Sequence, residues 1–180
     1  IVAGVCTGLG IPPDAIGKVI GITKSYCTRV GSGPFPTEDT GKDGEALRTA
    51  GKEFGATTGR ARRCGWIDLP QLEYACMLNG VTELCVTKMD VLNGFDPIKI
   101  GTAYKINGHK TNHLPYDLDA PGLNPVFEDC EGWTRLTNEQ SSFEQIPVEA
   151  RDYVRKIEDR LDLRISYLST GPERDDFIIR

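Results

Sequence analysis

Residues 68–90 read DLPQLEYACMLNGVTELCVTKMD, and within them a helix signal is followed closely by a strand signal. Asp68 is a typical N-cap, and apolar residues recur at helical spacing after it until Gly80, a typical C-terminal stop. This pattern predicts a helix over Leu69–Asn79. Glu83–Thr87 is short and apolar in its middle, as a buried strand is. A helix that leads directly into a buried strand indicates the α/β class.

Further helix, strand and loop signals lie on both sides of this unit. Apolar spacing and glycine or proline punctuation predict helices, and Asn-Gly between two partly alternating stretches predicts a β-hairpin. The predicted elements are helices over 12–26, over 44–54 with Gly55 as C-cap and from Pro147 onward, a hairpin of 98–106 and 109–114, a strand over 163–168, and loops over 28–38, 56–63 and 115–124. We therefore expect part of a mostly parallel sheet with flanking helices plus a β-hairpin.

Length and composition describe a globular chain with an acidic balance. At 180 residues, against roughly 150 for a typical domain, one domain over residues 1–180 is expected. Lys and Arg number 21 and Asp and Glu 26, and the resulting net charge of −5 argues against sequence-independent binding of nucleic acid. No apolar run reaches the roughly 20 residues that cross a bilayer. The chain opens at Ile1 without a secretory signal, so we expect a cytoplasmic protein that does not bind membranes.

The cysteines and histidines give no metal or disulfide pattern. The six cysteines contain no Cys-x-x-Cys pair, and without a secretory signal we expect reduced thiols. His109 and His113 stand four residues apart, a spacing that can bind metal on a helix. The adjacent Asn-Gly turn signal and the missing third ligand favour two exposed hairpin histidines instead. We therefore predict no metal site in this chain.

A basic loop, Thr57-Thr58-Gly59-Arg60-Ala61-Arg62-Arg63, is a candidate anion site. Guanidinium groups present a planar fork of donors that matches a carboxylate or phosphate, and threonine hydroxyls and turn amides add further donors. The alternative is a solvated basic loop that only keeps the surface soluble. Spacing alone favours neither, but the concentration of three arginines in an acidic chain favours the anion site.

Two further candidates follow predicted strands, where ligands of open α/β sheets bind. In Thr87-Lys88-Met89-Asp90, the carboxylate can accept hydrogen bonds from N1–H and the exocyclic amine of guanine, a donor pair that adenine lacks. The lysine stem could cover the base plane. Ser169-Thr170-Gly171-Pro172-Glu173-Arg174 offers backbone amides and hydroxyls to a base or ribose. For each segment taken alone, an ordinary turn after a strand is the alternative.

Taken together, these segments resemble the adenylosuccinate synthetase family, whose members join IMP and L-aspartate using GTP. The resemblance runs in the family's order over essentially the whole chain. It is carried by CTGLG at 6–10, TRVGSGPFPTE at 28–38, GATTGRARRCGW at 55–66, TKMD at 87–90 and STGPER at 169–174.

The resemblance implies the substrates and the residues that contact them. GTP phosphorylates O6 of IMP, and the amine of L-aspartate then displaces the phosphate. Arg60 would also lie near IMP and Arg62 near GTP, whereas Arg63 has no implied substrate contact. The implied aspartate and IMP residues are Val30, Ala56, Thr57, Thr58, Gly59, Arg60, Ala61 and Arg62, and the implied GTP residues are Arg62, Lys88, Met89, Asp90, Ser169, Thr170 and Gly171.

The resemblance also implies parts that have no counterpart here. Family members begin with a phosphate loop whose aspartate is base and magnesium ligand, followed by a histidine that assists phosphoryl transfer. We therefore expect a carboxyl-terminal portion of a homodimeric enzyme, inactive alone, with no catalytic residue of its own and with Mg²⁺ bound outside this chain. One alternative is a catalytically silent guanine-nucleotide-binding or interaction module. A weaker one is a regulatory GTPase, against which the Arg60 and Arg62 loop argues.

Overall fold

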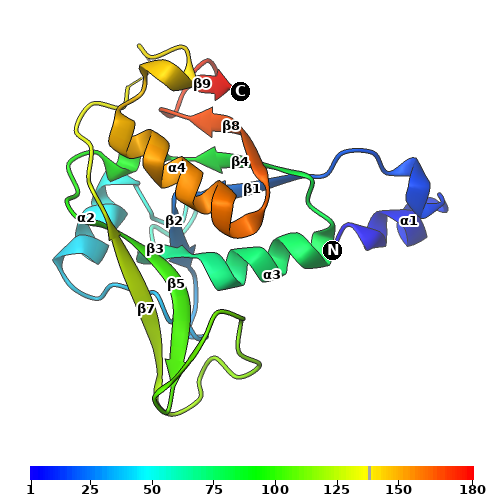
Figure 1. Ribbon diagram of the computed structural model, residues 1–180, viewed down its shortest axis with the longest axis horizontal. Coiled ribbons are helices and arrows are strands. Elements are labelled where there is room, and N and C mark those ends of the chain that lie inside the picture. The colour runs from blue at the N-terminus through cyan, green and yellow to red at the C-terminus, as the bar shows by residue number, and fades with distance from the viewer. Residues whose placement is uncertain (138) are drawn as a thin grey trace.

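The computed structural model describes residues 1–137 and 139–180, which form two sheets with helices packed against them, while the first helix, Ala3–Leu9, projects away from the sheets (Figure 1). The helices are α1 (Ala3–Leu9), α2 (Lys42–Ala50), α3 (Leu69–Asn79) and α4 (Val148–Leu161), with short 3-10 turns at Pro13–Ala15, Met89–Leu92 and Phe143–Gln145. The strands are β1 (Ile20–Lys24), β2 (Tyr26–Arg29), β3 (Arg63–Asp68), β4 (Glu83–Thr87), β5 (Ile98–Ile106), β6 (His109–Thr111), β7 (Leu123–Cys130), β8 (Arg164–Ser169) and β9 (Phe177–Ile179).

Both sheets are mixed. The first has the strand order β1-β4-β8-β9, in which β1, β4 and β8 are parallel and β9 is antiparallel to β8. Helix α4 lies across this sheet (Figure 1). The second has the order β2-β3-β5-β6, with β7 also paired to β5, and only β3 and β5 run parallel. The predicted α/β class is confirmed, while hairpin connections make the sheets less parallel than expected.

The elements with complete local signals are confirmed. Asp68 caps α3 through a 3.1 Å hydrogen bond from the Gln71 backbone amide, and Gly80 ends the helix with a φ of +58°. Strand β4 has the predicted bounds, and β5 and β6 form the predicted hairpin around Asn107-Gly108. Helix α4 follows Pro147 and buries its apolar face, and β8 follows it within one residue of the predicted strand.

The predicted helix over residues 12–26 is wrong. The chain there forms a short 3-10 turn, then β1, then the start of β2. Its β-branched residues recur at helical spacing, but they suit a strand better, and β1 gains a full parallel pairing with β4. Gly21 permits this pairing, because a Cβ there would lie 2.9 Å from the Leu84 side chain.

Helix α2 ends earlier than predicted, at Gly51 instead of Gly55. A Cβ at Gly51 would lie 2.1 Å from the Tyr26 hydroxyl oxygen, so this glycine lets β2 approach the end of the helix. The residues after it, Lys52 to Phe54, therefore leave the helix. Because the helix ends early, the Glu53 side chain lies buried inside the molecule.

Strands β3, β7 and β9 and helix α1 had no sequence prediction. In β7, Pro125 interrupts the strand pattern, and it is tolerated because, within residues 1–137 and 139–180, β7 pairs with β5 alone. In β3, Gly65 interrupts the strand pattern. The structure explains that glycine, because a Cβ there would lie 2.1 Å from the Thr37 carbonyl oxygen.

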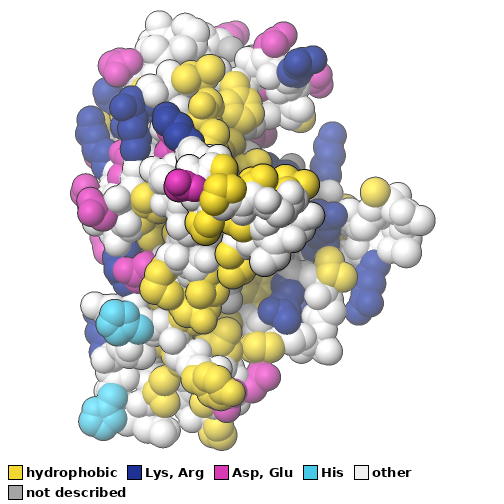
Figure 2. Space-filling model, turned by 90° about the vertical axis from the view of Figure 1, so that its right-hand side faces the viewer, with side chains coloured by type: hydrophobic (Ala, Val, Ile, Leu, Met, Phe, Trp, Pro, Cys, Tyr) yellow, Lys and Arg dark blue, Asp and Glu magenta, His cyan; other side chains and the backbone are white. Residues whose placement is uncertain are grey.

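Among the strands that the structure describes, β1 lies at an edge of the first sheet and pairs with β4 alone. Ile20 and Ile22 on this strand are 44% and 77% exposed. Hydrophobic side chains also spread over the face of the molecule shown in Figure 2. All six cysteines are free thiols, as predicted. Among the described residues, no helix combines the length and apolar character that a bilayer crossing requires.

Candidate functional site

The carboxyl ends of β4 and β8 lie at one edge of the first sheet, because the two strands are parallel neighbours. After β4 the chain turns at Lys88, whose φ of +62° lies in the left-handed region that non-glycine residues seldom adopt. The Ser25 hydroxyl donates a 2.8 Å hydrogen bond to the Lys88 carbonyl oxygen and supports this turn. The turn at residues 169–174 follows β8. The two predicted guanine-binding segments therefore end at the same edge.

A cavity of about 240 Å³ lies where these segments meet, and Lys88, Asp90 and Gly171 all line it. Asp90 is half-buried. Burial raises the pKa of its carboxyl, and the nearby Asp176 adds to the effect. Within the described part of the chain, the Asp90 carboxylate accepts no hydrogen bond from a side chain, and backbone amides at residues 90 and 91 act to lower its pKa. It therefore keeps acceptor capacity for a ligand.

The other predicted guanine-site residues lie behind this cavity. Met89, Ser169 and Thr170 are 0%, 7% and 3% exposed. The Ser169 hydroxyl donates to the Gly171 carbonyl oxygen (2.9 Å), and the Thr170 backbone amide donates to the Asp176 carbonyl oxygen (3.0 Å). The Ser169 hydroxyl thus supports the turn after β8, and none of these three residues lines the cavity.

The basic loop projects from the end of the segment after α2. Its base is closed by a bridge between Phe54 and Ala61 and by a 2.9 Å hydrogen bond from the Gly55 amide to the Arg60 carbonyl oxygen. Gly59, at φ +64°, allows the tight turn. Residues 56–61, which include Ala56, Thr57 and Thr58, are exposed, whereas Arg62 is half-buried. The loop is thus a fixed turn whose side chains face solvent.

Glu53 is the site residue that sequence reasoning missed. Its side chain is fully buried, and one oxygen, Oε1, accepts hydrogen bonds from Lys88 Nζ (2.7 Å), Lys24 Nζ (2.8 Å) and the Tyr26 hydroxyl (2.6 Å). The other oxygen, Oε2, accepts from Arg62 NH1 (2.7 Å). No local pattern identifies it, because all these partners except Arg62 lie far away in the sequence, on β1, on β2 and in the turn after β4. One buried carboxylate thus connects the predicted aspartate loop to the predicted guanine segment.

The ammonium group of Lys88 makes two hydrogen bonds within the described part of the protein. Besides Glu53, its Nζ donates to the Gly51 carbonyl oxygen at 2.7 Å. The lysine nevertheless lines the cavity, which leaves its aliphatic stem as the part beside the empty space.

Arg63 has a structural role that the sequence did not reveal. It forms a double ion pair with Glu38, and its NH1 donates to the carbonyl oxygens of Gly31 (3.0 Å) and Gly33 (2.7 Å). The hydrogen bonds from Arg63 lower the pKa of the Glu38 carboxyl. Arg63 therefore holds the loop that begins at Val30, whose own side chain is 67% exposed.

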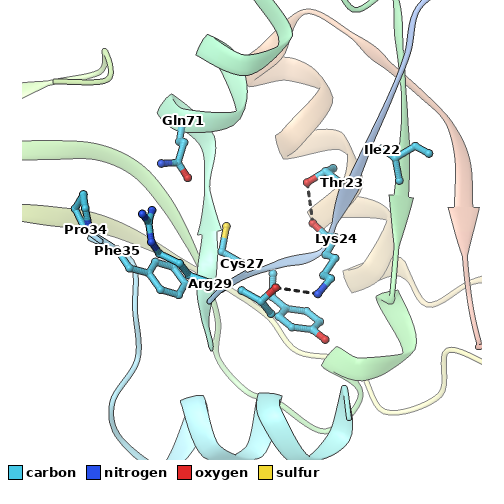
Figure 3. A pocket seen from close by; sticks show the side chains of 10 residues that line it. Ile22, Thr23, Lys24, Cys27, Arg29, Pro34, Phe35 and Gln71 are labelled. Atoms are coloured by element: carbon cyan, nitrogen blue, oxygen red, sulfur yellow. Dashed lines mark hydrogen bonds between the residues drawn. The ribbon is translucent and has the colours of Figure 1, made fainter. Parts of the chain in front are cut away.

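A second cavity, of about 300 Å³, lies between β1, β2 and this loop (Figure 3). Arg29 and Phe35 lie together on one side of it and Lys24 on the other. Lys24 Nζ donates to the Thr28 hydroxyl at 2.9 Å as well as to Glu53. Lys24 therefore connects this cavity to the Glu53 carboxylate, which also accepts hydrogen bonds from Arg62 and Lys88.

The two histidines take no part in the candidate site. His109 and His113 are exposed, and Figure 2 shows both histidine side chains on the surface at one end of the molecule. Within residues 1–137 and 139–180, no group of three or more His, Cys, Asp or Glu side chains could hold a metal ion.

The ionised Glu53 should stabilise the fold in a pH-dependent way. Burial raises the pKa of its carboxyl, but hydrogen bonds from Lys24, Lys88, Tyr26 and Arg62 outweigh burial and lower it from 4.5 to about 2. The folded pKa lies below the unfolded one, so the stabilisation is present above 4.5 and is lost as the pH falls toward 2.

We therefore expect Glu53→Gln to lower the melting temperature most at neutral pH and progressively less below about pH 5. Thermal unfolding of the variant and the unaltered protein across this range measures the difference. Glu144→Gln, at an exposed position, is the control and should show a small difference at every pH. A Glu53→Gln difference that stayed constant with pH would contradict the ion-pair account.

Sequence comparisons point to one family. The sequence model of the adenylosuccinate synthetase family matches residues 1–178. Adenylosuccinate synthetase of Cytophaga hutchinsonii is 50% identical over 181 aligned residues, covering 100% of this chain and 42% of the relative. That of Paramecium tetraurelia is 46% identical over 180 residues, covering 99% of this chain and 42% of the relative. The chain thus spans about two fifths of the length of these curated relatives.

Solved structures agree with this result. Fully ligated adenylosuccinate synthetase from Plasmodium falciparum matches with a TM-score of 0.93 at 36% identity, over 99% of this chain and 43% of that one. Succinoaminodeoxyadenylate synthetase of cyanophage S-2L, bound to dGMP and dATP, matches with a TM-score of 0.53 at 17% identity, over 99% and 38% of the two chains. The second likeness concerns the fold alone. Together the two matches confirm the predicted fold.

Proposed function

The chain belongs to the adenylosuccinate synthetase family, and from that premise we propose that it supplies the aspartate-binding loop and the guanine-recognition residues of an enzyme that forms adenylosuccinate. The substrates would be IMP, L-aspartate and GTP. The observation that carries the proposal is the meeting of Lys88, Asp90 and Gly171 at one cavity, next to the carboxylate that holds Arg62. A family-length enzyme is a protein of the family's full length that carries residues 1–180.

Guanine recognition is assigned to Asp90. Its half-buried carboxylate would accept hydrogen bonds from N1–H and the exocyclic amine of the base. Partial burial strengthens such bonds, because water competes less well for the same donors. The Lys88 stem would lie along the base, and the turn at Gly171 would close the other side of the cavity. In a nucleotide with a carbonyl oxygen in place of the exocyclic amine, two hydrogen-bond acceptors would face each other, so that base would bind less well.

Aspartate recognition is assigned to the basic loop. Arg62 NH1 donates a hydrogen bond to Glu53, and within the described residues the Arg62 Nε and NH2 groups make no hydrogen bond. Those donors suit a carboxylate, and Arg60, Thr57 and Thr58 lie exposed on the same loop. Two forked guanidinium groups could fix both the position and the rotation of a dicarboxylate, so that its amine faces C6 of the purine.

The chemistry divides into two steps. The γ-phosphoryl group of GTP passes to O6 of IMP, and the amine of aspartate then attacks C6 while phosphate leaves. The residues of this chain would bind and orient the reactants, and positioning is a large part of such catalysis. We assign no catalytic residue to this chain. The described residues contain no donor set for Mg²⁺, so no step is assigned to that ion here, and Mg²⁺ would be bound elsewhere in the family-length enzyme.

The family-length enzyme would be a cytoplasmic homodimer that needs neither nucleic acid nor a membrane. Residues 1–180 on their own should form no adenylosuccinate, because they offer no candidate for the base. A spectrophotometric assay with IMP, L-aspartate, GTP and Mg²⁺ compares the family-length enzyme with residues 1–180 at equal concentration. We expect turnover by the first and none by the second.

Either of two results would contradict this proposal. Turnover by purified residues 1–180 would show that the base lies within this chain. Guanine-nucleotide binding by the family-length protein without any turnover would favour the catalytically silent module.

A further inference from the structure

Glu53 touches both proposed subsites without facing either cavity. Its Oε2 holds the Arg62 guanidinium and its Oε1 holds the Lys88 ammonium, each at 2.7 Å. The backbone reinforces the first contact, since the Arg62 amide donates to the Glu53 carbonyl oxygen at 2.9 Å. Arg48 Nε donates to the Arg62 carbonyl oxygen, also at 2.9 Å. The main chain at Arg62 is therefore fixed, and its side-chain direction depends on Glu53.

The charges around Glu53 make it indispensable to this arrangement. Lys24, Arg62 and Lys88 are 28%, 33% and 34% exposed in their side chains, whereas that of Glu53 is 0% exposed. Three cations therefore surround a single buried anion. Without that anion they would repel one another and turn toward solvent, since their long stems can rotate. Arg62 and Lys88 would then lose the directions that suit the two ligands.

We propose that Glu53 is a positioning residue for both substrate subsites. One carboxylate oxygen directs Arg62 toward the aspartate and the other draws the Lys88 ammonium away from the guanine plane. Glu53 itself contacts neither substrate. This inference rests on the proposed function, because it concerns how the same site binds its ligands.

The test is steady-state kinetics of Glu53→Gln in the family-length enzyme. Glutamine keeps the size of the side chain but removes its charge and turns an N–H group toward the cations. We expect the KM for aspartate and the KM for GTP each to rise roughly tenfold or more, and the KM for IMP to change less than about threefold. Turnover by the unaltered enzyme tests the proposed function separately. The ratio of each KM in the variant to the same KM in the unaltered enzyme tests the role of Glu53.

A second variant and a double-mutant cycle separate positioning from folding. Glu53→Asp keeps the charge but shortens the side chain by one methylene, so it should fold and still raise both KM values. In an Arg62→Leu background, Glu53→Gln should raise the aspartate KM much less than it does alone, because its partner is gone. The control is Glu73→Gln, which breaks a double ion pair with Arg160 away from the candidate site.

The KM values of the Glu53 variants decide whether Glu53 positions both subsites. Unchanged KM values for aspartate and GTP in a folded Glu53→Asp enzyme would overturn it. Equal increases for all three substrates, or additive effects in the cycle, would overturn it too, because they would indicate a general structural role. Failure of Glu53→Gln to fold leaves Glu53→Asp as the deciding variant.

Discussion

Arg62→Leu in the family-length enzyme should raise the KM for aspartate and lower kcat/KM. The fall in kcat/KM should correspond to a loss of roughly 2–4 kcal/mol of transition-state stabilisation. The lost interaction is a charge-assisted pair in a half-buried position, between the remaining guanidinium donors and a substrate carboxylate. The fold should survive the change, because Lys24 and Lys88 still neutralise the buried Glu53 carboxylate. Kinetics with aspartate varied and IMP and GTP saturating measure the effect.

Arg63 is the neighbouring arginine without an implied substrate contact, but its bonds to Glu38, Gly31 and Gly33 make Arg63→Leu a structural lesion. Lys105→Leu, at an exposed position on β5, removes a positive charge without breaking such contacts. It should leave the aspartate kinetics near those of the unaltered enzyme. If Arg62→Leu behaved like Lys105→Leu, the basic loop would be only a solvated surface.

Asp90→Asn should move the nucleotide preference of the family-length enzyme from GTP toward xanthosine triphosphate. The substitution replaces an acceptor oxygen with an N–H donor that faces the N–H groups of guanine, and a mispaired, partly buried polar contact costs about 1–3 kcal/mol. Xanthine carries a carbonyl oxygen where guanine has its exocyclic amine, so the new donor gains a partner there. The measurement is kcat/KM for both nucleotides.

Asp175→Asn is the matched control, because Asp175 is an exposed carboxylate in the turn after β8 and does not line the cavity. It should leave the ratio of the two nucleotides unchanged. An unchanged ratio for Asp90→Asn as well would remove Asp90 from the nucleotide site. A loss of activity with both nucleotides in equal measure would indicate that Asp90 supports the turn at β4 and does not read the base.

The sequence predicted the fold where the signal was local and complete. The cap, helix and stop at Asp68, Leu69–Asn79 and Gly80 lie next to one another in the chain, and the structure has all three. The predicted helix over residues 12–26 failed because its apolar spacing is ambiguous, and pairing with β4 decides the outcome. Pro125 hid β7 for a related reason, since only the one-sided pairing of that strand makes a proline acceptable there.

The residues of the candidate site also divide into those with a local sequence signal and those whose role depends on distant contacts. Lys88, Asp90 and the arginine loop could be proposed because strand ends and clustered arginines are visible as contiguous patterns. Glu53 could not be, because its importance comes from partners on β1, β2 and the turn after β4 that only the folded chain brings to it. The structural role of Arg63 was hidden in the same way, behind contacts with Glu38 and the carbonyl groups of a distant loop.

The open side of β1 has a consequence for the colloidal behaviour of residues 1–180 in solution. An edge strand presents unpaired backbone N–H and C=O groups, and exposed isoleucines beside them make it a template for intermolecular β-sheet growth. Natural proteins blunt such edges with charge or proline. Ile20, Gly21 and Ile22 provide neither, and the charged residue of β1, Lys24, is bound to Glu53. We therefore expect self-association of residues 1–180 through this strand to increase as the protein concentration rises.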